Sequence, residues 1–326
     1  LLTLALFSIS SVSAQNIDVN TTNNINPLNE VLIDETIATS NELTNKSSII
    51  SNDLEKYYKD DKGFCATFYN ENGTPLTNKN ITFSVNGVSY IKTTDNNGTA
   101  KLNINLESGN YTIISYNPTT NETITNNITV LSSINGNDLT KYFKNATQYS
   151  VTLYDKTGKA LVNKTVRFNI NGIFYERKTN EKGVAQLNIN LDPGNYIVTV
   201  YNLITGEEKS NNINVVSRIQ LLDLNNASNV ILPEGYVIPV MFIGNGKAYA
   251  QCRATTLDEK GNPLANQLVT FNINGIIYKG TTDKFGIIDA IIYVNADWGN
   301  TYHICTATFG ESFTSQTVIV KRFVMG

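Results

Sequence analysis

Residues that often carry chemistry are scarce in this sequence, which has one His, one Trp, two Met and three Cys among 326 residues. A metal site built on imidazoles, or an acid/base pair, normally needs more than one histidine, so we expect His303 to be an ordinary strand residue. The cysteines show no close spacing such as C-x-x-C, and no G-x-S-x-G segment marks a serine nucleophile. We therefore expect no enzyme activity, no metal and no cofactor.

Charged residues are also few, at 16%, and the formal net charge is -3, so no basic field exists to hold nucleic acid or an anionic membrane. Long apolar runs are rare too, because nothing beyond the first residues approaches the roughly 18–20 apolar residues of a membrane span. Residues 1–14 form a short apolar run that closes with Val12-Ser13-Ala14, a pattern like that before a signal-peptidase cut. We interpret 1–14 as the remnant of a signal peptide whose start lies upstream, and the protein as secreted.

The sequence is rich in Asn, Thr, Ile and Val, with 17 Tyr and 13 Phe. This composition is typical of strand-rich proteins. Residues 15–51 contain many Asn, Thr and Ser but too few apolar residues to enclose a core. We therefore expect an Asn/Thr-rich, disordered linker at 15–51.

Two long segments then repeat each other at a constant spacing of 85 residues. The matching positions are Gly73 and Gly158, Gly87 and Gly172, Gly98 and Gly183, and Gly109 and Gly194. A third copy is recognisable 103 residues beyond the second, in Gly261, Gly275 and Gly286, and it loses register near Asp297–Tyr302. The spacing indicates tandem copies of one folding unit, the last of them divergent.

The second copy shows most clearly how each unit folds. The apolar residues Tyr149, Val151 and Leu153 alternate with polar ones, which is the period of a strand with one buried face. A second alternating run ends at Asn171-Gly172, a pair that accepts the positive φ angles of a type I′ hairpin turn. About seven such strands in roughly 80 residues, with no helical period, predict an antiparallel sandwich.

The chain is thus predicted to be all-β, with tandem Ig-like antiparallel β-sandwich modules after a short disordered N-terminal segment. We expect modules at 52–133 and 137–219 and a divergent module at 220–326. Each copy carries a full set of inward-facing rows and turns, so each is expected to fold by itself.

Three segments of the second module carry a resemblance to a known family: NDLTKYFKN at 137–145, KTVRFNING at 164–172 and LNINLDPGNY at 187–196. They are similar to the Ig-like repeats of adhesin-like surface proteins from methanogenic archaea, closely over 52–219 and loosely beyond. The resemblance implies an extracellular, cell-wall-associated protein whose modules are strung between an exposed tip and an anchor. It implies no catalytic residues.

Acidic turns are the strongest candidates for a cation site. Asp95 and Asp283 each stand three residues before a glycine, as oxygen ligands do in calcium loops. Calcium requires six to eight oxygens, and these turns offer two or three, with no closing Glu at EF-hand spacing. We therefore interpret them as plain turns in which the Asp side chain caps its own backbone and the glycine takes a positive φ.

Cysteines and glycosylation sequons are the other candidate sites. Cys252 and Cys305 lie on an early and a late strand of the third module, where they can approach across the sandwich and form a disulfide in an oxidising compartment. Cys65 aligns with a polar strand position and is expected to be unpaired and nearer the surface.

Several Asn-x-Ser/Thr sequons offer sites for N-glycosylation. The candidates are Asn72, Asn97, Asn121, Asn145 and Asn226.

These patterns favour an extracellular, non-catalytic adhesin-like protein, with the modules forming a surface stalk or adhesive arm in cell adhesion. Its expected partners are glycans or proteins of a cell wall, a host or a neighbouring cell. One alternative is that the modules are the spacer of a larger surface enzyme. The other is a carbohydrate-binding module using Tyr90, Tyr175 and Tyr278, which follow the Asn-Gly turns, although recurrence in all three copies favours packing.

Overall fold

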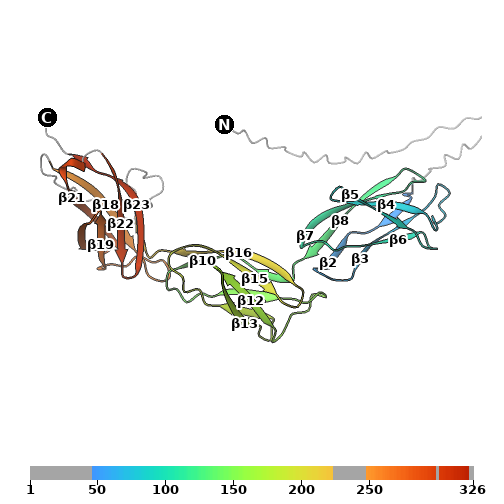
Figure 1. Ribbon diagram of the computed structural model, residues 1–326, viewed down its shortest axis with the longest axis horizontal. Helices are drawn as coiled ribbons and strands as arrows, with labels where there is room; N and C mark the ends of the chain where they lie inside the picture. Colours follow the sequence, from blue (N-terminus) through green and yellow to red (C-terminus); the bar gives the residue numbers. More distant parts are fainter. Residues whose placement is uncertain (1–45, 223–246, 299–300, 323–326) are drawn as a thin grey trace, which may run out of the picture. The chain divides into compact units, whose positions relative to one another are not determined.

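The computed structural model describes residues 46–222, 247–298 and 301–322. Its strands fall into three groups of two sheets each (Figure 1), named here module 1 (47–131), module 2 (132–216) and module 3 (217–322). The one helical element within the described ranges is the 3-10 turn η2, Ala296–Trp298. The protein is therefore all-β, as predicted, whereas the signal-peptide remnant at 1–14 lies outside the described residues.

Module 1 packs a three-stranded sheet, in the order β1-β3-β6, on a five-stranded sheet, in the order β2-β8-β7-β4-β5. Neighbouring strands are antiparallel, except that β2 runs parallel to β8. The strands are β1 Ile49–Ser51, β2 Leu54–Tyr57, β3 Gly63–Phe68, β4 Asn80–Val85, β5 Val88–Thr93, β6 Thr99–Asn103, β7 Gly109–Tyr116 and β8 Thr123–Leu131.

Module 2 repeats this arrangement strand for strand, with sheets in the orders β9-β11-β14 and β10-β16-β15-β12-β13. The parallel pair recurs between β10 and β16. The strands are β9 Ile134–Gly136, β10 Leu139–Tyr142, β11 Tyr149–Leu153, β12 Thr165–Ile170, β13 Ile173–Lys178, β14 Val184–Leu187, β15 Gly194–Asn202 and β16 Glu207–Val216.

Module 3 has sheets in the orders β17-β18-β21 and β20-β19-β22-β23, and β24 also pairs with β18. A strand equivalent to β2 or β10 does not occur among its described residues. The strands are β17 Ile219–Leu221, β18 Ala248–Thr256, β19 Leu268–Ile273, β20 Ile276–Thr281, β21 Ile287–Val294, β22 Tyr302–Phe309, β23 Ser312–Ile319 and β24 Lys321–Arg322.

Strand pairing shows that each module begins with a strand of three residues. β1 pairs with β3, β9 with β11, and β17 with β18. β1 therefore lies inside the segment 15–51 that composition assigned to a linker, and Ile219 belongs to module 3 although the sequence placed it at the end of module 2. Strands this short have no readable alternation, so only their pairing partners reveal them.

The alternation of apolar residues sets the core of each module. In module 2, Tyr149, Val151 and Leu153 are buried on β11, and Phe168 on β12 is fully buried. The rings of Tyr149 and Phe168 meet edge to face, with centroids 6.1 Å apart. The three modules have separate core clusters that share no residue. Each module therefore has its own source of hydrophobic stability.

The predicted Asn-Gly hairpin is confirmed. Asn171 and Gly172 have φ angles of 52° and 79°, and the flanking strands β12 and β13 pair antiparallel up to Ile170 and Ile173. Equivalent turns close the β4–β5 and β19–β20 hairpins, again with positive φ at both Asn and Gly. Positive φ at both central positions is the geometry that lets a two-residue turn follow the twist of its strands.

Candidate functional site

In the acidic turns each Asp side chain caps its own backbone, as the sequence indicated. One carboxylate oxygen of Asp95 accepts the backbone N–H groups of Asn97 and Thr99 at 2.8 and 2.9 Å, and Gly98 has a φ of 74°. Asp283 accepts the N–H groups two and four residues further on, at 2.9 and 3.0 Å. These carboxylates close their own turns, and within the described residues no three His, Cys, Asp or Glu side chains gather as a metal site would require.

The single histidine also has a structural position. His303 lies half-buried on β22, stacked on Trp298 with ring centroids 4.7 Å apart. Its Nδ1 lies 2.7 Å from the side-chain nitrogen of Asn274, and its Nε2 lies 2.6 Å from the hydroxyl of Thr301. Both ring nitrogens therefore hold neighbouring side chains in place, as suits a strand residue with a packing role.

A buried lysine repeats in the first two modules, and sequence reasoning did not find it. Lys56 and Lys141 are only 3% and 5% exposed, on the parallel strands β2 and β10. Their ammonium groups donate to the backbone oxygens of Ile104, at 2.7 Å, and Ile189, at 2.9 Å. Burial lowers the pKa of both lysines. Each lysine stands two positions after an inward-facing leucine of the same strand. Its inward position therefore follows the strand's period of two, and that signal was present in the sequence.

A second repeated cluster ties the start of modules 1 and 2 to a hairpin turn. Ser48 donates its backbone N–H and its hydroxyl to the same Glu122 oxygen, both at 2.6 Å, as Ser133 does to Glu207 in module 2. Burial alone would raise the pKa of Glu122, but hydrogen bonds from Ser47 and Ser48 outweigh it and keep the pKa below its usual value. These carboxylates are thus engaged in holding β1 and β9.

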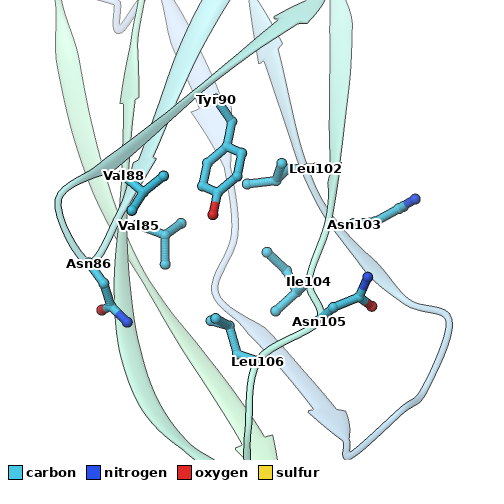
Figure 2. Close-up of a pocket in the computed structure, with 9 residues that line it drawn as sticks. All are labelled: Val85, Asn86, Val88, Tyr90, Leu102, Asn103, Ile104, Asn105 and Leu106. Atoms are coloured by element: carbon cyan, nitrogen blue, oxygen red, sulfur yellow. The ribbon is translucent and has the colours of Figure 1, made fainter.

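A pocket of about 290 Å³ opens at one edge of module 1, between the β4–β5 hairpin and β6 with the segment after it (Figure 2). In Figure 2, Val88 and Tyr90 of β5 face Leu102 and Ile104 across the pocket. The Tyr90 hydroxyl points into the space between them. Asn86, Asn103 and Asn105 also line the pocket, but in Figure 2 the side chains of Asn103 and Asn105 point away from the space in front of Tyr90.

The tyrosines that recur after the Asn-Gly turns are not equivalent in their packing. Tyr175 and Tyr278 are half-buried and pack against the cores of modules 2 and 3. Tyr90 is 39% exposed and stands over the pocket instead. A tyrosine ring can stack on the apolar face of a sugar. The Tyr90 position therefore combines an accessible ring with a pocket.

The sequons fall mainly on exposed positions. Asn72, Asn97 and Asn121 are exposed in turns of module 1, and Asn145 in module 2 is half-buried. Asn226 lies outside the described residues. Exposure makes the first three accessible to a glycosyltransferase, and their use stays a prediction.

Cys65 and Cys252 lie as the alternation predicts. Cys65 is exposed on β3, whereas Cys252 on β18 and Cys305 on β22 are fully buried in the core of module 3. The two buried residues come from different sheets. The described residues contain no helix long and apolar enough to cross a membrane.

No family model and no curated protein matches the chain. Among solved structures, it is similar to a Ca2+-stabilised adhesin with which an Antarctic bacterium binds ice (13% identity, 86% of this chain and 74% of that chain, TM-score 0.20). It is also similar to a Bacteroides ovatus protein of mixed-linkage glucan utilization in complex with a heptasaccharide (10%, 86% and 67%, TM-score 0.21). A third is trypsin-activated alpha-2-macroglobulin from Escherichia coli (12%, 85% and 23%, TM-score 0.28). TM-scores this low carry no argument, so the fold assignment rests on the strand pairing.

Proposed function

We propose that this protein is an extracellular, non-catalytic adhesin-like protein whose Ig-like modules form a surface stalk or adhesive arm. The observation that carries the proposal is the repetition of one sandwich, strand for strand, in modules 1 and 2. Polar groups such as Asp95, Glu122 and Lys141 are engaged in turns and strand contacts of their own module. Repeated modules stabilised in this way suit a load-bearing spacer better than a catalyst.

Cell-surface labelling tests this proposal. An antibody raised against residues 132–216 should label intact cells that make the protein, and protease added to those cells should remove the signal. Antibody against a cytosolic protein is the control and should label only permeabilised cells. Detection of the chain in the cytosol alone would contradict the proposal.

A second candidate function, carbohydrate binding, is favoured by the pocket beside Tyr90. Its volume of about 290 Å³ is near the lower end of small-molecule sites, which suits about one sugar ring. The ligand class would be a neutral glycan, because the pocket is lined by apolar side chains and amides and by no charged residue. Such glycans are among the surface partners that an adhesive arm would meet.

Binding of the full chain to an array of neutral glycans, followed by calorimetry with the strongest ligand, tests the pocket. Tyr90→Ala should weaken binding at least about tenfold, because losing the burial of a large side chain costs roughly 1.5–3 kcal/mol and each 1.4 kcal/mol is tenfold in Kd. Ile91→Ala is the matched control, because Ile91 is the next residue of β5, is 69% exposed and does not line the pocket. Equal losses in both variants, or no glycan bound at all, would exclude this site.

A further inference from the structure

The two buried cysteines of module 3 meet between its sheets. Their Sγ atoms lie 3.1 Å apart, and both side chains are fully buried. Cys252 belongs to the sheet β17-β18-β21, and Cys305 to the sheet β20-β19-β22-β23. A bond between them would join the two layers of the sandwich across 53 residues of chain.

Strand register shows what these positions hold in the other modules. Cys252 takes the position of Tyr149, and Cys305 takes that of Val198. In module 1 the same two positions hold Phe64 and an isoleucine. Modules 1 and 2 thus have one aromatic and one aliphatic side chain at the two positions where module 3 has thiols, so both positions differ together.

The rest of this core is also built from smaller side chains. Its buried cluster includes five alanines, whereas that of module 2 includes one, Ala185. The five are Ala248, Ala250, Ala254, Ala290 and Ala307. At three of these positions, those of Ala254, Ala290 and Ala307, module 2 has the larger Val151, Leu187 and Val200, so module 3 gains less there from the hydrophobic effect. A covalent bond between the sheets would offset that deficit by constraining the unfolded chain.

We propose that Cys252 and Cys305 form a disulfide that cross-links the two sheets of module 3. The sulfurs need to approach by about 1 Å to reach the disulfide bond length of about 2.05 Å. They stand on facing strands of different sheets, so side-chain rotation within the core supplies this movement. The cross-link is a property of module 3 alone, since modules 1 and 2 have no cysteine at the equivalent positions.

Formation of the bond requires an oxidant, which we assign to a small-molecule or protein disulfide outside the cell. The thiols of Cys252 and Cys305 lose two protons and two electrons as their S–S bond forms, and the external disulfide is cleaved to two thiols. In the folded module both thiols are fully buried, so an external disulfide cannot reach either sulfur. The exchange therefore takes place before the sheets close on each other.

Counting thiols tests the proposal in the full chain. The protein is refolded with a mixture of oxidised and reduced glutathione, unfolded in guanidinium, alkylated with iodoacetamide and weighed by mass spectrometry. We expect one alkylated cysteine without reductant and three after reduction. Cys65, exposed on β3, is the internal control and should be the residue alkylated in the first case. Peptide mapping without reductant should recover Cys252 and Cys305 in one cross-linked species.

Three alkylated cysteines under the oxidising condition, or a cross-link that includes Cys65, would overturn the proposal.

Stability is a second readout: reductant should lower the melting temperature of one transition by about 10 °C or more. The variant with Cys252→Ala and Cys305→Ala should lose that response to reductant. If this variant does not fold, the thiol count of the unmodified chain still decides, whereas an unchanged response in a folded variant refutes the assignment.

Discussion

Replacing Phe168 with alanine tests whether each module folds by itself. The ring is fully buried in the core of module 2, edge to face with Tyr149. Truncating a buried phenylalanine costs about 3–5 kcal/mol, through lost burial and the cavity left behind. For a domain of this size, each kcal/mol lowers the melting temperature by about 4–8 °C, so even about 3 kcal/mol predicts a decrease of about 12–24 °C.

Differential scanning calorimetry of the full chain is the assay, because it resolves separate transitions. Phe168→Ala should move one transition down by that amount and leave the others in place, since the three cores share no residue. Phe174→Ala is the matched control in the same hairpin, where the side chain is 56% exposed, and it should shift the same transition by only a few degrees. Movement of all transitions together would show that the modules unfold as one cooperative unit and refute the reasoning.

The folded-state pKa of Glu122 lies below its usual value of 4.5, so its contribution to stability is full above that value and is lost as the pH falls through the folded pKa. The urea midpoint of module 1 should therefore decrease on acidification. An equally steep decrease in Glu122→Gln would contradict this. Gly98→Ala should cost more than about 1 kcal/mol, because φ is +74° and a Cβ would lie 2.6 Å from a backbone oxygen of β3. Gly73→Ala, with similar φ but open space around it, should cost less, and urea titrations giving equal losses would refute the clash. Asn202→Ala should destabilise module 2 by about 1–3 kcal/mol, because the buried amide donates to the Tyr154 carbonyl at 2.9 Å, and an unchanged urea midpoint would argue against it.

Much of the fold was predictable because its causes are local. The period of two at Tyr149, Val151 and Leu153 predicted a strand with one buried face, and these three side chains are the buried ones. Asn171-Gly172 predicted a hairpin because few other residue pairs accept two positive φ angles. The constant spacing of the glycine turns predicted tandem modules, since one folding unit repeated along a chain must repeat its turns.

Some features depended on partners far along the chain. The parallel pairing of β2 with β8 joins strands separated by most of a module, and no local pattern indicates it. The inward position of Lys141 follows the strand period, but a buried ammonium is tolerable only because β10 brings it within 2.9 Å of the Ile189 carbonyl oxygen. The pocket beside Tyr90 likewise forms because a hairpin and β6 come together from separate parts of the sequence.

The cysteines of module 3 show where the division lies. Alternation along the strands, relative to Tyr149, indicates by itself that Cys252 faces inward, because side-chain direction in a strand is a local property. It does not indicate that the Sγ atoms of Cys252 and Cys305 lie 3.1 Å apart. That distance depends on which strands occupy which sheet and on how the two sheets face each other, and these are decided only when the whole sandwich packs around one core.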